Sequence, residues 1–249
     1  MTDALPPDHT PSGASTGAGN AAAPTEVRVM FDRIARRYDL MNLLISAFQE
    51  PRWRRRLVTS TGLRPGDAAL DVATGTGKVA HGLWRAVRPG GSVTGIDFAE
   101  GMLAVARKRY ADTPGLEFVQ GDALALPVDD ESFDAATIAF GMRNLADYHQ
   151  GFAEMRRAVR PGGRVVCLEI ARPSSRVARA AQAWFDLIVP IIGRVAGQGS
   201  AYGYLVSSTQ DYPDPERIAG IMRDVGLEDV RWEPLTLGIV TLHVGRRRG

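Results

Sequence analysis

The sequence predicts an α/β fold, a doubly wound and mostly parallel sheet with helices on both faces. The first observation is that apolar, β-branched runs alternate with stretches of helical periodicity from about residue 67 to residue 170. Such alternation is typical of parallel strands joined by crossover helices. The second observation is a pair of strand-like runs near the carboxyl end, "LEDVRWE" and "GIVTLHV", separated by "PLTLG". This spacing predicts an antiparallel hairpin at the edge of the sheet.

The elements of the alternating region are separated by three similar turns. "LRPGD" and two copies of "VRPGG", which begin at residues 63, 87 and 159, each place a proline after a helical stretch and a glycine before an apolar run. The expected helices cover residues 79–87, 102–110 and 148–159. The expected strands cover residues 68–72, 92–97, 116–120, 133–140 and 164–170.

Segments of different composition flank this region. Residues 1–24 are rich in Pro, Gly, Ser, Thr and Ala, and we predict a disordered extension because little apolar surface is present to offset the entropy of ordering. Residues 25–249 are predicted to form a single domain that starts with a helical lid at 25–61. Further helices are expected around residues 175–194 and 215–225.

The composition excludes several classes of protein. The net charge of the 249 residues is only +2, so no nucleic-acid partner is expected. The four histidines lack metal-ligand spacing, so no metal is expected, and the single cysteine favours a reducing cytoplasm. The most apolar stretch, residues 184–193, has about half the length needed to span a bilayer. The expected location is therefore the cytoplasm, with a peripheral contact at the inner membrane face left open.

The loop after the first expected strand contains two closely spaced glycines, Gly75 and Gly77. Together with Ala80 this loop satisfies the dinucleotide-binding pattern G-x-G-x-x-(G/A), and Asp97 follows Gly77 by 20 residues. The spacing by itself therefore leaves an NAD-binding oxidoreductase open.

The acidic residues favour a different ligand. Asp71 directly precedes the loop, where a carboxylate would oppose a pyrophosphate and favour a sulfonium or an amino group. Asp97 ends the second expected strand and can accept hydrogen bonds from ribose hydroxyls, and Asp122 follows the third strand at the level of an adenine edge. Acids at three successive strand ends fit S-adenosylmethionine better than NAD.

Several stretches resemble known families. "LDVATGTG", "VTGIDFAEGML", "VQGDALALPVDDESFDAATIAFGMRNL" and "AVRPGGRVVCLEI" resemble the successive motifs of class I S-adenosylmethionine-dependent methyltransferases. The upstream stretch "VMFDRIARRYDLMNLLISAFQEPRWRR" resembles the amino-terminal signature of the ubiquinone/menaquinone biosynthesis C-methyltransferases. "FGMRN" and the tail from "YGYLVSSTQDYPDPER" onward are similar to the same family.

This resemblance implies a Rossmann-like sheet of seven strands and S-adenosyl-L-methionine as the cofactor. Carried over by position, it implies cofactor contacts by Thr76, Asp97, Asp122 and Ala123, with Gly75 and Gly77 allowing the backbone to come close. This chain departs from the family pattern at Glu50, Lys78, Ala139 and Ala171.

The implied reaction is methyl transfer to a ring carbon of a lipophilic prenylated quinol. An arginine- and alanine-rich composition like that of actinobacteria favours demethylmenaquinol as the acceptor. The ubiquinone-pathway 2-polyprenyl-6-methoxy-1,4-benzoquinol, or another aromatic metabolite, stays open as an alternative, as does a homodimer.

The resemblance also implies the residues that act on the acceptor. Arg143 is expected to face the cleft and to stabilise phenolate charge or hold a water, with Asn144 orienting the ring. Tyr38, from the lid, is expected to bond the quinol oxygen. The apolar residues Leu43, Leu44, Ile45, Phe48 and those at 188–192 are expected either to line a channel for the prenyl tail or to pack in a core or dimer.

Overall fold

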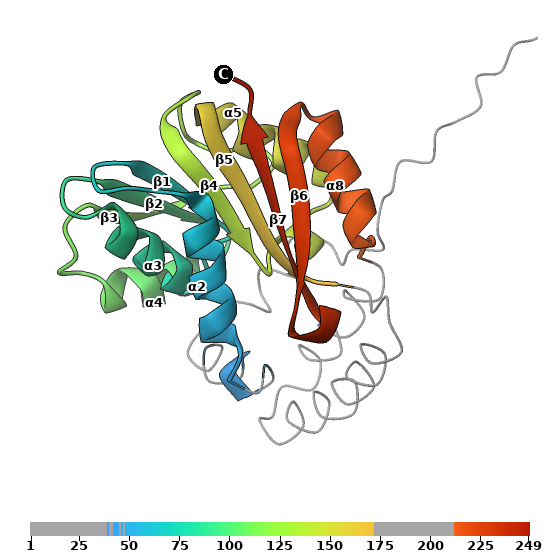
Figure 1. Cartoon of the computed structure of the whole chain (residues 1–249). Coiled ribbons are helices and arrows are strands. Elements are labelled where there is room, and N and C mark those ends of the chain that lie inside the picture. The colour runs from blue at the N-terminus through green and yellow to red at the C-terminus, as the bar shows by residue number, and fades with distance from the viewer. Residues whose placement is uncertain (1–38, 40–41, 45, 47, 172–211) are drawn as a thin grey trace, which may run out of the picture.

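The computed structural model describes residues 39, 42–44, 46, 48–171 and 212–249. Its seven strands form one sheet in the order β3-β2-β1-β4-β5-β7-β6 (Figure 1). Neighbouring strands from β3 to β5 are parallel, whereas β7 is antiparallel to both β5 and β6. The predicted fold class and the terminal antiparallel hairpin are confirmed.

The strand and helix bounds lie close to those expected from the sequence. The strands are β1 (Ala68–Val72), β2 (Ser92–Asp97), β3 (Leu116–Gln120), β4 (Phe133–Ala139), β5 (Val159–Ile170), β6 (Leu227–Leu235) and β7 (Val240–Arg247). The described helices are α2 (Glu50–Thr61), α3 (Lys78–Val87), α4 (Glu100–Arg109), α5 (Tyr148–Ala158) and α8 (Pro215–Asp224), with short 3-10 turns η1 (Met142–Asn144) and η2 (Thr236–Gly238).

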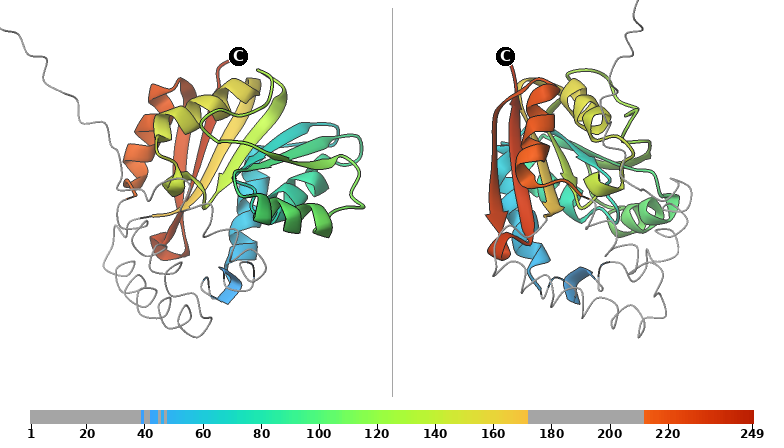
Figure 2. Two further views of the ribbon diagram at one scale, coloured as in Figure 1. Left: turned by 180° about the vertical axis from the view of Figure 1, so that it is seen from behind. Right: turned by 90° about the vertical axis from the view of Figure 1, so that its right-hand side faces the viewer.

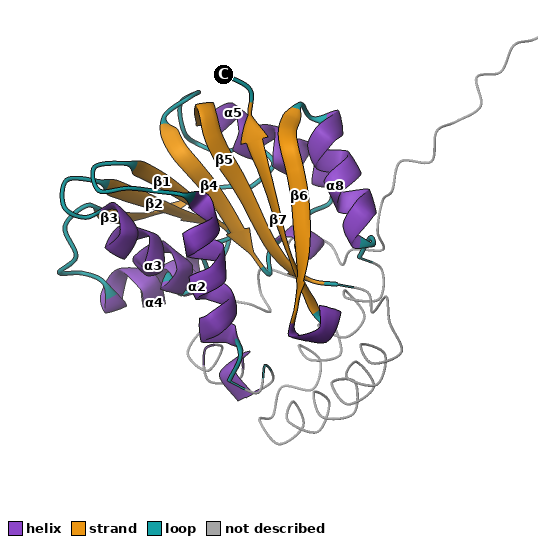
Figure 3. Ribbon diagram, viewed as in Figure 1, coloured by secondary structure: helices purple, strands orange, loops and turns teal. Residues whose placement is uncertain are grey.

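Helices cover both faces of the sheet (Figure 2 and Figure 3). Because successive strand residues point to opposite faces, Ala69 of β1 packs with α2 and α3, whereas Leu70 packs with α5 and α8. Two buried apolar clusters result, one on each side of the sheet. Burial on both faces explains why the parallel strands are near-continuous apolar runs in the sequence.

One turn differs from its expected role. The second "VRPGG" was expected to separate a helix from a strand that begins at residue 164. Instead, β5 begins at Val159, which pairs with Phe133, and the register against β4 then shifts so that Arg164 pairs with Ala135. The turn is thus an irregularity inside the strand rather than a connection before it.

Some expectations lie outside the described residues. These are the disordered extension at 1–24, the lid residues 25–38 and the long helix around 175–194. Within the part of the chain that the structure describes, no helix is long and apolar enough to cross a membrane. The same part holds no group of three His, Cys, Asp or Glu side chains that could bind a metal ion.

Candidate active site

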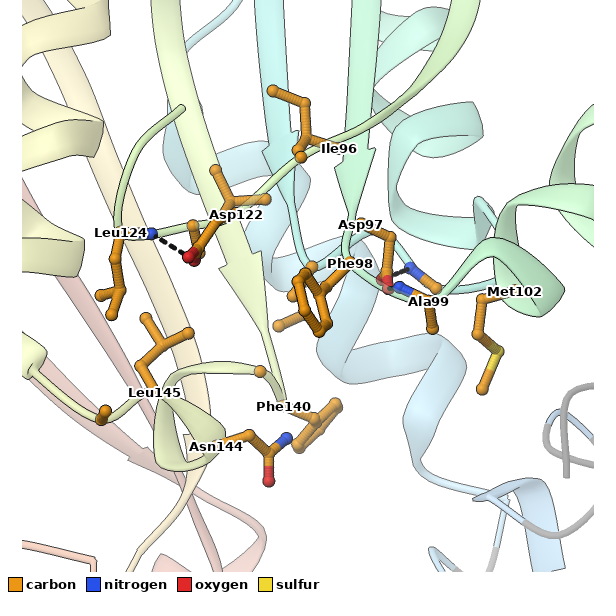
Figure 4. A pocket seen from close by; sticks show the side chains of 18 residues that line it. Ile96, Asp97, Phe98, Ala99, Met102, Asp122, Leu124, Phe140, Asn144 and Leu145 are labelled. Carbon is orange, nitrogen blue, oxygen red and sulfur yellow. Dashed lines mark hydrogen bonds between the residues drawn. The ribbon is translucent and has the colours of Figure 1, made fainter. Parts of the chain in front are cut away.

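A pocket lies at the carboxyl edge of the sheet, between the loops that follow β1, β2, β3 and β4 (Figure 4). Ligands of doubly wound sheets bind at this edge. The described wall is mostly apolar and includes the rings of Phe98 and Phe140. Its polar side chains are Asp97, Asp122 and Asn144, and none of the described residues in the wall is basic.

Asp97 ends β2, and the loops on either side hold its carboxylate. Oδ2 accepts a hydrogen bond from the amide of Gly75 at 2.7 Å, and Oδ1 accepts one from the amide of Ala99 at 2.9 Å. Each carboxylate oxygen can accept more than one hydrogen bond. Asp97 is therefore oriented in the pocket wall with capacity for the ribose hydroxyls that the sequence led us to expect.

The loop after β3 places Asp122 and Ala123 in the same wall. Asp122 is exposed, and its Oδ1 accepts a hydrogen bond from the amide of Leu124 at 2.9 Å (Figure 4). This local bond fixes the turn, so that a second acidic group stands at the pocket beside apolar side chains. Such a combination can hold the edge and the face of an adenine.

The two glycines of the loop after β1 serve different purposes. Gly75 lines the pocket, and its left-handed backbone (φ +56°) is a conformation that glycine adopts without strain. Gly77 is not part of the described wall, and a Cβ added there would come within 2.7 Å of the Phe118 ring. Gly77 therefore leaves room for the Phe118 ring of β3, and a close approach of its backbone to the cofactor stays a prediction.

Thr76, expected to contact the cofactor, is also not part of the described wall. Its hydroxyl donates a hydrogen bond to Oδ1 of Asp39 at 2.7 Å. Asp39 belongs to the "YDLMN" stretch of the upstream signature. The side chain of Thr76 thus connects the glycine loop to the amino-terminal segment, and a contact to the cofactor by this residue stays a prediction.

Asp71 is buried in the sheet and is not part of the described pocket wall, although the next residue, Val72, lines the pocket. It accepts hydrogen bonds from the hydroxyls of Thr74 and Thr137 at 2.6 and 2.7 Å, and from the amide of Ala80 in the first turn of α3. Burial outweighs these bonds and raises the pKa of Asp71 to about 6.

Asp71 therefore supports the loop and the helix through its hydrogen bonds, and an influence of its carboxylate on the ligand stays a prediction. Its bond to Ala80 also takes up an amide at the amino end of α3. A pyrophosphate bound there would need such amides.

The segment after β4 separates the two residues assigned to the acceptor. Asn144 lies in the pocket wall, whereas Arg143 is buried and is not part of the described wall. The Arg143 guanidinium donates to Oε1 of Glu169 at 2.6 Å and to the carbonyl of Phe140 at 2.7 Å, and the Arg143 amide donates to Oε2 of Glu169 at 3.2 Å. The expectation that Arg143 faces the cleft needs correction: its guanidinium is buried and paired with Glu169.

Arg143 therefore holds the turn that carries Phe140 and Asn144 to the pocket. Phe140 adopts a left-handed backbone (φ +58°), a conformation that costs a residue other than glycine about 1–3 kcal/mol and persists only where the surroundings impose it. A role for Arg143 in charge stabilisation stays a prediction.

The remaining predicted acceptor residues are only partly covered by the structure. Tyr38, Ile45 and residues 188–192 lie outside the described residues. Leu43 is half-buried, but Leu44 and Phe48 are 41% and 63% exposed. The predicted tail channel is therefore not tested by the structure.

Several residues of this region were not predicted from the sequence. Phe98, Met102, Phe140 and Leu145 line the pocket, and Glu169 pairs with Arg143. Phe98 could have been found because it directly follows Asp97. Glu169 could have been found because it is an acid within the apolar run "VVCLEI", and a buried acid needs a partner.

The pocket suits an adenosine-containing ligand with positive charge better than a dinucleotide. Its described wall combines apolar surface with two carboxylates and lacks the basic groups that pair with phosphates. Its residues therefore fit S-adenosylmethionine, whose sulfonium and amino groups are cationic and whose ribose and adenine are uncharged.

Comparison with known proteins distinguishes between a methyltransferase and a dinucleotide-binding enzyme. A profile described as "ubiE/COQ5 methyltransferase family" matches residues 20–247. The chain belongs to the ubiE/COQ5 methyltransferase family. Membership confirms the family resemblance and the expected enzyme, an S-adenosylmethionine-dependent methyltransferase, and excludes the NAD-binding alternative.

Individual relatives of this ubiE/COQ5 family chain agree in length and fold. The demethylmenaquinone methyltransferase of Staphylococcus aureus strain JH9 is 40% identical over 230 residues, which cover 92% of this chain and 95% of that protein. A possible histamine N-methyltransferase from Thermotoga maritima shares the fold with a TM-score of 0.63 at 19% identity, covering 89% of this chain and 100% of that one.

The fold alone does not define the reaction. The [4+2]-cyclase SpnF has a TM-score of 0.68 to this structure at 16% identity, over 94% of this chain and 99% of that one. A cyclase and a methyltransferase thus share one architecture, as expected when function depends on the site rather than the scaffold.

Proposed function

We propose that this chain transfers a methyl group from S-adenosylmethionine to a ring carbon of demethylmenaquinol. The observation that carries the proposal is the 40% identity, over 92% of the chain, to a curated demethylmenaquinone methyltransferase. The pocket supports it because its acids and apolar surface suit the cofactor, and because the side chains of Phe140 and Asn144 extend it toward an acceptor.

The residues of the pocket can each be given a task in this reaction. When bound, S-adenosylmethionine supplies the electrophilic methyl group. Asp97 would hold the ribose, and Asp122 and Ala123 the adenine, which orients the cofactor for an in-line transfer. The rings of Phe98 and Phe140 line the same pocket and would help to exclude water once cofactor and acceptor are bound.

The acceptor carbon becomes nucleophilic only when a neighbouring ring hydroxyl loses its proton. The amide of Asn144 can donate a hydrogen bond to the resulting oxyanion and fix the ring plane. Arg143 keeps Asn144 in place through its bonds to Glu169 and to the Phe140 carbonyl. We infer that its positive charge also favours the ionised quinol.

The test is methyl transfer by the purified chain with S-adenosylmethionine and a short-tail demethylmenaquinone analogue. The reduced quinol should become methylated and the oxidised quinone should not, because only the quinol has a hydroxyl to ionise. Methylated products are detected by mass spectrometry. If the benzoquinol precursor of ubiquinone is methylated faster, that compound and not demethylmenaquinol is the acceptor.

We also infer that the chain contacts a membrane surface beside the pocket. Phe48 and Leu237 are 63% and 66% exposed, and a 2.8 Å hydrogen bond from Nε1 of Trp53 to the hydroxyl of Thr236 connects their two segments. Exposed arginines on α2, including Arg52, add positive charge that suits anionic lipid. Sedimentation with anionic vesicles tests this, because replacing both Phe48 and Leu237 by serine should reduce binding without changing turnover of a soluble analogue.

A further inference from the structure

The carboxylate of Asp39 joins three separate segments of the chain. Its Oδ1 accepts a hydrogen bond from the hydroxyl of Thr76 at 2.7 Å and lies 3.2 Å from Nζ of Lys78 at the start of α3. Its Oδ2 lies 2.6 Å from a guanidinium nitrogen of Arg109, the last residue of α4. Asp39 thus lies between two cations beside the glycine loop.

Asp39 is ionised in this arrangement. Burial opposes its ionisation, but the hydrogen bonds from Thr76 and Arg109 and the charges of Lys78 and Arg109 outweigh burial, so that its pKa lies below the usual value. The side chains of Lys78, Arg109 and Asp39 are 27%, 37% and 20% exposed, so solvent only partly screens their charges.

Two further charged groups belong to the same neighbourhood. Glu50 pairs with Arg54 at 2.9 Å, and burial raises the pKa of Glu50 above its usual value. With both acids ionised, Asp39 and Glu50 oppose the three cations Lys78, Arg109 and Arg54. Without Asp39, the positive excess of this cluster would increase by one charge.

This cluster lies close to the pocket. Thr76, which bonds Asp39, directly follows Gly75 in the chain, and Gly75 lines the pocket. Adjacent Cα atoms are about 3.8 Å apart, so the residue that bonds Asp39 lies next to the pocket wall. We take the charges of the cluster to act on a bound ligand because the Debye length at physiological ionic strength is about 8 Å. A change of one charge in the cluster must therefore affect a charged ligand more than a neutral one.

We propose that Asp39 is a specificity-determining residue, which offsets the positive charge of Lys78 and Arg109 and thereby allows the pocket to bind a cationic sulfonium. This inference rests on the proposed function. Asp39 is not part of the described pocket wall. Its charge should affect the affinity for the methyl donor more than the affinity for the demethylated product. S-adenosylmethionine carries the sulfonium charge, whereas S-adenosylhomocysteine has the same adenosine and amino-acid groups with a neutral thioether.

The experiment measures the affinities of the full chain for both ligands by calorimetry. In Asp39→Asn, affinity for S-adenosylmethionine should fall about threefold to tenfold more than affinity for S-adenosylhomocysteine, the scale expected for one partly screened charge. Lys78→Met removes a cation and should change the ratio of the two affinities in the opposite direction. Both differences should shrink at high salt because the effect is electrostatic.

Asp229→Asn is the matched control. This acid is exposed near the start of β6, and its left-handed backbone (φ +51°) suits asparagine. The variant changes the net charge as much as Asp39→Asn does and should leave the affinity ratio unchanged. Lys78→Met keeps the proposal testable if Asp39→Asn does not fold.

The possible failures can be told apart. Equal loss of affinity for both ligands in Asp39→Asn, with no change of the ratio in Lys78→Met, would make Asp39 a structural clamp and overturn the inference. Failure of the unmodified chain to bind either ligand would instead contradict the proposed function.

Discussion

On the half of the carboxyl edge formed by β1, β2 and β3, the carboxylates of Asp97 and Asp122 lie in the pocket wall and accept hydrogen bonds from backbone amides. On the half formed by β4 and β5, Glu169 is fully buried and pairs with Arg143. The first half presents acids to the pocket, whereas the second uses an acid to hold the turn that carries Asn144.

The difference shows that an acid at a strand end does not by itself mark a ligand contact. An exposed or half-buried carboxylate held by amides keeps capacity to accept from a ligand. Burying an unpaired carboxylate costs free energy, so a buried carboxylate is paired with a group of the protein. That partner then occupies the oxygens that could otherwise accept hydrogen bonds from a ligand. Asp71, on β1 where the first half adjoins β4, is a third case because its side-chain partners are neutral hydroxyls.

The largest effect is expected on the β4–β5 half. Arg143→Ala leaves Glu169 buried without its guanidinium, so the free energy of unfolding should fall by about 3–5 kcal/mol. If Arg143 also stabilises the ionised quinol, single-turnover methyl transfer should slow by about 10²–10³-fold. Urea denaturation and rapid-quench kinetics measure the two quantities.

The double variant Arg143→Met with Glu169→Gln separates these roles. Removing both charges should restore much of the stability, because no unpaired charge stays buried. Turnover that recovers together with stability would reduce Arg143 to a positioning residue for the turn. Turnover that stays low in a stable double variant would support direct action on the acceptor.

Asp71→Asn tests the boundary between the halves. Because the folded-state pKa of Asp71 is raised to about 6, the folded chain holds this proton more tightly than the unfolded chain. The contribution of Asp71 to stability should therefore fall as the pH rises from about 4 to about 6 and stay constant above that. Relative to the unmodified chain, the free energy of unfolding of Asp71→Asn should increase by up to about 3 kcal/mol over this pH window. A constant difference between the two urea midpoints at pH 4.5 and pH 7 would contradict the raised pKa.

Asp97→Ala tests the pocket half. The free energy of binding S-adenosylhomocysteine should become less favourable by roughly 1.5–3 kcal/mol, the scale of lost hydrogen bonds to a charged acceptor. Asp67→Ala is a suitable control, because its carboxylate also accepts a backbone amide, that of Arg64 at 2.7 Å, but lies before the start of β1 at the opposite edge of the sheet. Calorimetry that finds equal affinities for both variants would remove Asp97 from the cofactor site.

The smallest effect is expected from a change that touches neither half. Deletion of residues 1–22 should leave the melting temperature and the turnover unaltered, because this stretch has little apolar surface to pack. A large loss of turnover in a folded truncation would mean that the extension contributes to the site.

The sequence by itself determined the sheet and the pocket edge. Alternating apolar runs and helical stretches, followed by a hairpin, can form few architectures, because parallel strands need crossover helices on both faces. The same topology brings the strand ends together, which is why Gly75, Asp97, Asp122, Ala123 and Asn144 line one pocket.

The tertiary structure decided the partner of each polar side chain. Thr76 bonds Asp39 across 37 positions, Arg143 bonds Glu169 across 26, and Asp71 bonds Thr137 across 66. Such pairs form because desolvated polar groups must find partners, and which groups meet depends on how the elements pack. Local sequence patterns place a side chain on an element and at an edge, but only the packed fold shows whether it is left for a ligand or used by the protein itself.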